Sequence, residues 1–468
     1  MTSNNKAFKA GFWYVISNFL VKGLAFITTP IFTRLMTKNE IGIFSVGATW
    51  VSILTVLSTL NLYDTVMLAK YDFEAEFEKY ISTIVILGTL ISMAVYAGVF
   101  IVPNIEKIID IPDYAIHIIF IYVAFSPCTQ ILLTKYRSEM KYKESAILSV
   151  IISIVPSVLA VGLAICLEDK LKGRFFGFYL PLILLNVALF LYLIVRGKSF
   201  KWRYCRYAFP IAIPMVVHYL NGTIMGFSDR LMIQKMCNTE EVALYSIAYT
   251  CAAMMDVLRN SLNAAWDPWV FEKLSLRKHE EIKKYSKPYV IFYLIICLYV
   301  IFLAPDIMIL LGGDAYIKAV YVIPPVIVGY IFCMIYSLYA CVERFCKKQK
   351  WFAFISSVAA CTNIVLNLWF IPKFGYIAAA YTTLIGYAVS CGLHFINSYR
   401  FKITYMYDTK FNVFVLFSGL AMILLSNLLY LNFLFRYAVI ICITIILLVI
   451  YKREKDNIKN FIADIQSN

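Results

Sequence analysis

Long apolar runs alternate with short polar stretches along the whole chain. Each run is close to the roughly twenty residues that a helix needs to cross about 30 Å of hydrocarbon. The runs lie at 11–33, 41–63, 81–103, 114–134, 145–167, 175–195, 208–229, 242–265, 288–311, 319–342, 351–371, 375–398, 411–430 and 433–451. The pattern predicts an all-α integral membrane protein with about fourteen transmembrane helices.

The last two spans are predicted from one long apolar stretch, 411–451, which is interrupted by Asn427, Asn432 and Arg436. A single straight helix of that length would extend about 60 Å, twice the thickness of the hydrocarbon layer. We therefore expect the stretch to fold back as a hairpin.

The N-terminus places Lys6 and Lys9 before the first apolar run, as a signal peptide does. The run continues from Gly11 to Phe32 without a small-residue cleavage motif. We expect it to remain as the first transmembrane helix.

Lysine and arginine are distributed unevenly between the two sets of alternate loops. If the N-terminus is cytoplasmic, the inside segments hold 30 of these residues and the outside loops hold 11. Because basic residues resist translocation, this bias predicts that both termini are cytoplasmic. The external loops are all short, so we expect no external domain that performs chemistry.

Composition supports the membrane interpretation. Of the 468 residues, 61% are hydrophobic and 15% are charged, whereas about 25% are charged in a soluble domain. The net charge of +15 is spread over alternate loops, which indicates topology rather than a nucleic-acid partner. The 12 cysteines are scattered without a CxxC pair, so neither a disulfide framework nor a metal site is expected.

An internal repeat indicates how the helices are organised. Residues 34–46 and residues 230–247 share an Arg-Leu-Met triplet, followed by an acid and a similar apolar pattern. Six helices separate the copies, so the two halves have the same orientation, as parallel transporter repeats do. We predict lobes at 1–200 and 201–405, and a helix pair with a cytoplasmic tail at 406–468.

Lys22 lies about eleven positions into the first helix, near the middle of the bilayer. A basic side chain there costs about 2.5–3.5 kcal/mol to insert, so it is a candidate functional residue. The structural alternative is that Lys22 snorkels or pairs with an acid on another helix.

The eighth helix carries a polar stripe of Asp256, Arg259, Asn260 and Asn263, whose spacing puts them on one face. That face is not expected to meet lipid. The alternative is that Asp256 and Arg259 neutralise each other and serve only packing between helices.

The seventh helix contains Pro210 and Pro214, each of which removes a helical hydrogen bond and makes the helix bendable. His218 could titrate near neutral pH, or could be a packed, hydrogen-bonded residue. Asn221 follows it, and the helix ends at Asp229-Arg230, which we interpret as structural.

Several catalytic motifs are missing from the sequence. There is no GxxxxGK[ST] phosphate loop, no HExxH and no GxSxG, which argues against a P-loop ATPase or a membrane hydrolase. We expect a transporter rather than an enzyme, without a cofactor. Its energy would come from an H⁺ or Na⁺ gradient, from the gradient of the substrate, or from a partner.

The residues around the seventh and eighth helices resemble a known family. Segments 207–214, 227–230 and 242–249 are similar to the polysaccharide flippases, including the Wzx-type O-antigen flippases. These belong to the superfamily of multidrug, oligosaccharidyl-lipid and polysaccharide exporters. Segments 33–45, 304–316 and 371–380 agree with the same family, so the resemblance covers nearly the whole chain.

The resemblance implies two six-helix lobes around a central cavity, plus a further helix pair. It implies that the protein moves an undecaprenyl-diphosphate-linked oligosaccharide, such as an O-antigen or capsule unit, between leaflets by alternating access. Cavities in the family tend to be cationic, so we expect Lys22 and Arg259 to bind the diphosphate. The cavity and coupling candidates are Asp256, His218, Asn221, Asn260 and Asn263, and expected partners are membrane lipids and other polysaccharide-assembly proteins.

Two alternatives stay open at this stage. A cation-coupled multidrug exporter of the same superfamily would share the fold, but would be expected to carry acidic groups in its cavity. A membrane-embedded polysaccharide polymerase or glycosyltransferase commonly needs a sizeable loop or domain, which the short external loops do not provide.

Overall fold

The computed structural model describes residues 23–101, 104–139, 141–346, 351–445 and 447–448. Within these ranges the chain is all-helical, and twelve helices are long and apolar enough to cross a membrane. They correspond to the second to thirteenth predicted spans, which confirms the fold class. Of the two outer spans, the first is helical over 23–35 and the last forms the shorter helix Phe433–Ile445.

The first bundle contains the helices before residue 198. Helix α8 packs against α9, and α9 also packs against α4 and α6, so α9 is the centre of this bundle. Helices α6 and α7 together form one span that is interrupted at Ser126. The elements are α2 (Lys38–Thr59), η1 (Leu62–Asp64), α3 (Thr65–Asp72), η2 (Glu74–Glu76), α4 (Phe77–Ile101), α5 (Ile105–Ile109), α6 (Asp113–Phe125), α7 (Pro127–Ser138), α8 (Tyr142–Cys166) and α9 (Lys170–Gly197).

The second bundle is built around α14, which packs against α11, α12, α16 and α17. The turn between α17 and the helix that starts at Phe433 confirms the predicted C-terminal hairpin. The elements are α11 (Thr239–Ser275), α12 (His279–Phe302), α13 (Ala304–Gly312), η3 (Asp314–Val322), α14 (Ile323–Phe345), α15 (Phe352–Phe374), α16 (Tyr376–Arg400), η5 (Thr404–Met406) and α17 (Thr409–Leu429).

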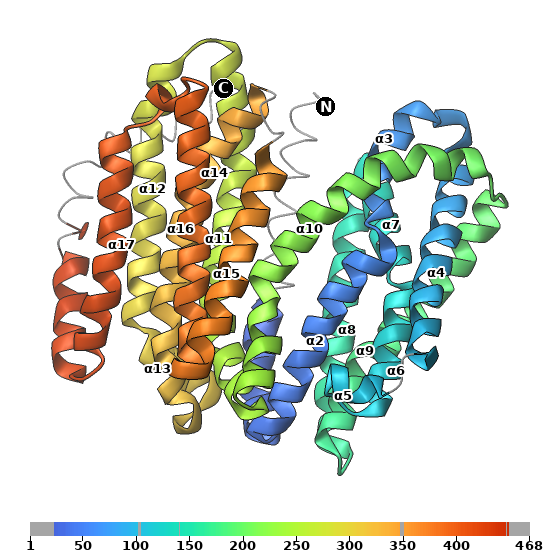
Figure 1. The fold of residues 1–468 in the computed structure, drawn as a ribbon, viewed down its shortest axis with the longest axis horizontal. Coiled ribbons are helices and arrows are strands. Elements are labelled where there is room, and N and C mark those ends of the chain that lie inside the picture. The colour runs from blue at the N-terminus through green and yellow to red at the C-terminus, as the bar shows by residue number, and fades with distance from the viewer. Residues whose placement is uncertain (1–22, 102–103, 140, 347–350, 446, 449–468) are drawn as a thin grey trace.

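Helix α10 (Trp202–Met236) connects the two bundles. The bundles lie apart at the end of the molecule that carries α3 and approach each other at the opposite end, with α10 running diagonally between them (Figure 1). At 1.5 Å per residue its 35 residues extend about 52 Å, enough to span the membrane at a tilt. It packs against α3 and α4 of the first bundle and against α15 and α16 of the second.

The bundles meet where α2 and α11 begin, and we call this end of the molecule the apex. Helix α2 begins with a capping box between Thr37 and Glu40, and Asn238 caps α11 by accepting a hydrogen bond from the Glu241 amide at 2.8 Å. These segments belong to the two copies of the sequence repeat. Gly42 allows them to touch, because a Cβ atom there would overlap the backbone of Thr239.

Further contacts close the apex. Thr33 donates a hydrogen bond to the carbonyl of Leu311 at 2.6 Å, and Gln234 donates to the carbonyl of Asp110 at 2.8 Å. These bonds join neutral groups, and neither is an ion pair. The sequence predicts that the apex lies on the external side of the membrane.

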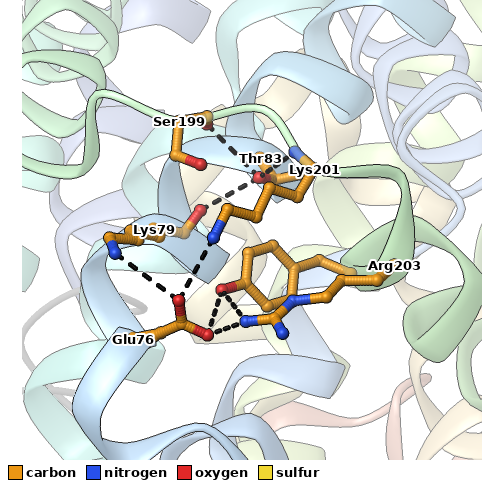
Figure 2. A network of polar contacts seen from close by, with 7 residues as sticks. Glu76, Lys79, Thr83, Ser199, Lys201 and Arg203 are labelled. Carbon is orange, nitrogen blue, oxygen red and sulfur yellow. Dashed lines mark hydrogen bonds and ion pairs between the residues drawn. The ribbon is translucent and has the colours of Figure 1, made fainter.

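At the opposite end, Glu76 holds the linker between α9 and α10 against the first bundle (Figure 2). Its carboxylate pairs with Arg203 and with Lys201, whose Nζ lies 3.2 Å from Oε1. Tyr204 donates to the second oxygen at 3.0 Å, and the Lys201 amide donates to the Thr83 hydroxyl at 3.2 Å. The start of α10 is therefore fixed to η2 and α4.

Substitution of Gly42 tests the close contact at the apex. Gly42→Val should lower the free energy of unfolding by about 1–3 kcal/mol, because the side chain overpacks the α2–α11 contact. Thermal unfolding in detergent measures the effect. Gly162→Val on α8, where a Cβ meets open space, is the control. Equal unfolding temperatures for the two variants would contradict the contact.

Candidate functional site

Two neighbouring cavities lie between the bundles, on either side of the helical segment 23–35. The first, of about 500 Å³, we call the aromatic cavity, and the second, of about 470 Å³, we call the hydroxyl cavity. Both volumes are within the range of ligand sites, roughly 300–1,000 Å³. The residues that line both are Ala25, Phe227, Arg230 and Thr250. The cavities are therefore two adjacent compartments of one site.

Arg230 stands at the junction of the two cavities. It projects from α10 and is 8% exposed. Its Nε donates to the Ser246 hydroxyl at 3.1 Å and its Nη1 to the Gly226 carbonyl at 3.0 Å, while the guanidinium lies 4.7 Å from the Tyr249 ring centroid. In the described part of the chain no carboxylate forms an ion pair with it, so its positive charge is available to a ligand.

Arg174 supplies a second cation to the hydroxyl cavity from α9. Its guanidinium lies between two aromatic rings, 4.0 Å from the centroid of Phe32 and 3.9 Å from that of Phe44. Such cation–π contacts hold a guanidinium in place without neutralising its charge. Among the described residues Arg174 also has no ion-pair partner, so two guanidinium groups without a paired carboxylate line the hydroxyl cavity.

The lining of the hydroxyl cavity also contains many serine and threonine side chains. Those with a defined hydrogen bond donate to a backbone carbonyl one turn earlier, as Ser157 does to Ser153 at 2.7 Å and Thr250 does to Ser246 at 2.8 Å. Their oxygen lone pairs remain free to accept hydrogen bonds. The hydroxyl-bearing residues are Thr28, Thr29, Ser45, Thr49, Ser153, Ser157, Ser246 and Thr250.

Asp229 lies beside Arg230 in the sequence but is compensated elsewhere. Its side chain is fully buried and accepts hydrogen bonds from Tyr245 at 2.5 Å, from Asn367 at 2.7 Å and from Thr383 at 2.8 Å. The donors come from α11, α15 and α16, so the carboxylate ties α10 to the second bundle. These donors satisfy the hydrogen-bonding capacity of the Asp229 carboxylate. Because they are neutral, they do not cancel its negative charge.

The predicted polar stripe of α11 is paired within itself. Arg259 donates to Oδ1 of Asp256 at 2.7 and 3.1 Å, and Asn260 donates to Oδ2 at 3.1 Å. Asp256 lines the aromatic cavity, while Arg259 is not among the residues that line either cavity. Asp256 and Arg259 therefore form the mutually neutralising pair that the sequence offered as one of two alternatives. A role for Arg259 in binding diphosphate stays a prediction.

The remaining predicted residues are placed as follows. Asn263 accepts hydrogen bonds from Tyr289 of α12 at 2.9 Å and from Ser337 of α14 at 3.3 Å, and Asn221 donates to Ser357 of α15 at 2.8 Å. The bonds of Asn263 connect helices within the second bundle, and the bond of Asn221 connects α10 to that bundle. His218 lies on α10, but its side chain is outside what the structure describes, as is Lys22.

Sequence reasoning missed both cavity arginines. Arg174 was counted in an external loop, because the predicted span began at residue 175, whereas α9 begins at Lys170 and carries Arg174 into the bundle. Arg230 was interpreted as structural, together with Asp229, because the two residues stand at the end of the predicted span. The available signal was the aromatic residues near both arginines, since Phe175 and Phe176 follow Arg174 and Phe227 lies one turn before Arg230.

The arrangement defines a class of protein. Two helical bundles flank a cavity lined by arginines, in a chain with twelve described helices long and apolar enough to cross a membrane, which is an architecture typical of membrane transporters. Residues 7–274 match the family described as polysaccharide biosynthesis protein, and residues 214–369 match the MatE family. The chain belongs to the polysaccharide biosynthesis protein family, within the superfamily of multidrug, oligosaccharidyl-lipid and polysaccharide flippases and exporters.

Several other proteins are similar to the chain. The lipid II flippase MurJ in an inward closed conformation superposes with a TM-score of 0.73 at 16% identity, over 95% of this chain and 99% of that one. An outward-facing MATE family transporter gives 0.53 at 12% identity, over 85% and 96%. An uncharacterised membrane protein of Methanocaldococcus jannaschii is 22% identical over 430 residues, 83% of each chain. The structural likenesses show a shared fold.

Removal of Asp229 tests the buried cluster. Asp229→Ala leaves the donors on Tyr245, Asn367 and Thr383 unpaired inside the protein, and should lower the free energy of unfolding by about 3 kcal/mol. Thermal unfolding in detergent gives the measurement. Asp229→Asn should retain more stability, and Asp314→Ala, at an exposed position, is the control. A wild-type unfolding temperature for Asp229→Ala would show that the cluster does not stabilise the fold.

Proposed function

We propose that this protein is a flippase that carries a polyprenyl-diphosphate-linked oligosaccharide from the inner to the outer leaflet of a bacterial cytoplasmic membrane. The expected substrate is an undecaprenyl-diphosphate-linked unit of O-antigen, capsule or exopolysaccharide. The polyprenyl tail stays in the lipid while the diphosphate and the sugars pass through the cavity. Other polysaccharide-assembly proteins supply and collect the substrate.

The observation that carries this proposal is the pair of arginines without an ion-pair partner among the described residues, Arg174 and Arg230, in the hydroxyl cavity. A guanidinium presents paired donors that match the geometry of phosphate oxygens. Two of them facing one cavity suit a diphosphate, whose negative charges are adjacent. Lys22 and Arg259 remain predicted contributors to the same anion site.

Alternating access follows from the closed apex. In the present conformation the bundles touch where α2 and α11 begin, and they diverge at the opposite end (Figure 1). If the apex is external, as the basic-residue distribution predicts, the cavity receives substrate from the cytoplasmic side. Opening of the apex and approach of the bundles at the other end would then expose the sugars to the outside.

Coupling to an H⁺ or Na⁺ gradient is part of the proposal. Asp256 and His218 were the candidates from the sequence, but Asp256 is engaged by Arg259 and Asn260. Asp229 is a further candidate, because it is buried and hydrogen-bonded only through neutral groups among the described residues. A cation that binds it would alter the contact of α10 with α15 and α16.

The MatE match gives a reason to keep one alternative, a cation-coupled multidrug exporter. The charge of the hydroxyl cavity opposes it, because an organic cation would face Arg174 and Arg230 without a carboxylate in that lining. A membrane polymerase is disfavoured because the family and fold matches are to transporters. Increased drug sensitivity of a deletion strain would indicate an exporter, and unchanged drug sensitivity would favour the flippase.

Substitution of the cavity arginines tests the proposal. In liposomes, transport of a fluorescent polyprenyl-diphosphate disaccharide should fall at least about tenfold in Arg174→Gln and in Arg230→Gln, since each loses charge-assisted hydrogen bonds of about 1.5–3 kcal/mol. Arg174→Lys keeps the charge but not the paired donors, so an intermediate rate is expected.

Arg196→Gln is the matched control, because Arg196 lies on α9, as Arg174 does, but at an exposed position. It should transport at the wild-type rate. Wild-type transport by both cavity variants, at equal protein incorporation, would overturn the assignment of the diphosphate site. Failure of the wild-type protein to move the probe would overturn the flippase proposal.

A further inference from the structure

The aromatic cavity differs from the hydroxyl cavity in the chemistry of its walls. Three tyrosines from three helices face it: Tyr249 of α11, Tyr330 of α14 and Tyr387 of α16. The rings of Tyr330 and Tyr387 lie 5.9 Å apart between centroids, and the Tyr330 hydroxyl donates to that of Tyr249 at 3.0 Å. The tyrosines therefore form one connected cluster, with flat apolar faces and polar rims.

The position of Tyr387 is supported by the backbone behind it. Its ring packs over Gly329 of α14, where a Cβ atom would come within 2.9 Å of the ring. The glycine thus lets the ring lie against α14 at the cavity wall. Within the described part of the chain the Tyr387 hydroxyl has no hydrogen-bond partner, so it is free to bind a ligand in the cavity.

The charges in the aromatic cavity exclude a second anion. Asp256 presents its carboxylate there, but Arg259 and Asn260 already bind it, so this end of the cavity carries no net positive charge. The positive end is at Arg230, which the cavity shares with the hydroxyl cavity. A ligand that places its anionic group at Arg230 would therefore extend an uncharged part toward the tyrosines.

We infer that the aromatic cavity is a subsite for an uncharged sugar ring, the one attached directly to the diphosphate. The apolar C–H face of a pyranose packs on a tyrosine ring, while its hydroxyl groups find acceptors at Asp256 and at the tyrosine hydroxyls. The diphosphate lies between Arg230 and Arg174. This inference rests on the proposed flippase function and adds to it the chemical class of the first sugar.

Two variants test the subsite from opposite directions. Tyr387→Leu removes a ring from the wall. Gly222→Leu adds a side chain to it, at a position that lines the aromatic cavity alone and where a Cβ atom meets open space. Because leucine favours helix over glycine, the second variant should fold even if the first does not. The controls are Tyr381→Leu at an exposed position of α16 and Gly162→Leu on α8.

Binding of two probes to the purified protein in detergent distinguishes the contribution of the sugar to affinity from that of the diphosphate. The probes are farnesyl diphosphate and the same compound carrying one glucose on its diphosphate. The wild-type protein should bind the glucosylated probe more tightly. Tyr387→Leu and Gly222→Leu should weaken that binding about tenfold, the order of one aromatic contact with its buried area, and leave farnesyl diphosphate binding unchanged.

The outcomes distinguish the inference from the proposed function. If the wild-type protein binds both probes equally, or if both variants keep the preference for glucose, the sugar subsite is wrong and the flippase proposal stands. A third probe carries glucuronic acid in place of glucose on the diphosphate. If the wild-type protein binds it as tightly as the glucosylated probe, the requirement for an uncharged ring is wrong. If the wild-type protein binds neither probe, the diphosphate site itself is overturned, and the subsite with it.

Discussion

Two guanidinium groups inside a membrane protein, neither paired with a carboxylate among the described residues, constrain the rest of this structure. A charge in hydrocarbon without a paired counter-ion is expensive, so Arg174 and Arg230 favour either water or an anion in the space that they face. The protein holds them by contacts that leave the charge intact: aromatic rings around Arg174, and a hydroxyl and a carbonyl around Arg230. The helices must therefore enclose a cavity, and that cavity favours an anionic ligand.

The acidic residues near these arginines are placed so that they do not neutralise them. Asp229 is adjacent to Arg230 in sequence, yet it points to Tyr245, Asn367 and Thr383. Asp256 faces the aromatic cavity but is bound by Arg259. Each carboxylate is satisfied by its own partners, and the positive charge remains where the cavities join. This separation explains why one site can combine an anion-binding compartment with an aromatic one.

The sequence predicted the helices well because membrane insertion imposes a strong and local pattern of apolar runs. The length of the apolar stretch 411–451 was enough to predict the C-terminal hairpin, since one straight helix of that length would be too long for the hydrocarbon layer. The cavity was harder to predict. Arg259 lies inside a predicted span and Arg174 just outside one, so the sequence favoured Arg259, whereas the partners favour Arg174: Phe32 and Phe44 surround Arg174, and Asp256 pairs with Arg259. Such partners are set by packing between distant helices, which a linear pattern does not encode.

The contacts between the bundles are suited to being broken and remade. At the apex they include a glycine against a backbone and single hydrogen bonds between neutral groups, each worth about 1 kcal/mol net. At the other end, Glu76 forms ion pairs with Lys201 and Arg203, which fix the start of α10 to the first bundle (Figure 2). The end of α10 is fixed to the second bundle through Asp229. A movement of one bundle against the other must then bend α10 between these two anchors, where Pro210 and Pro214 have each removed a helical hydrogen bond.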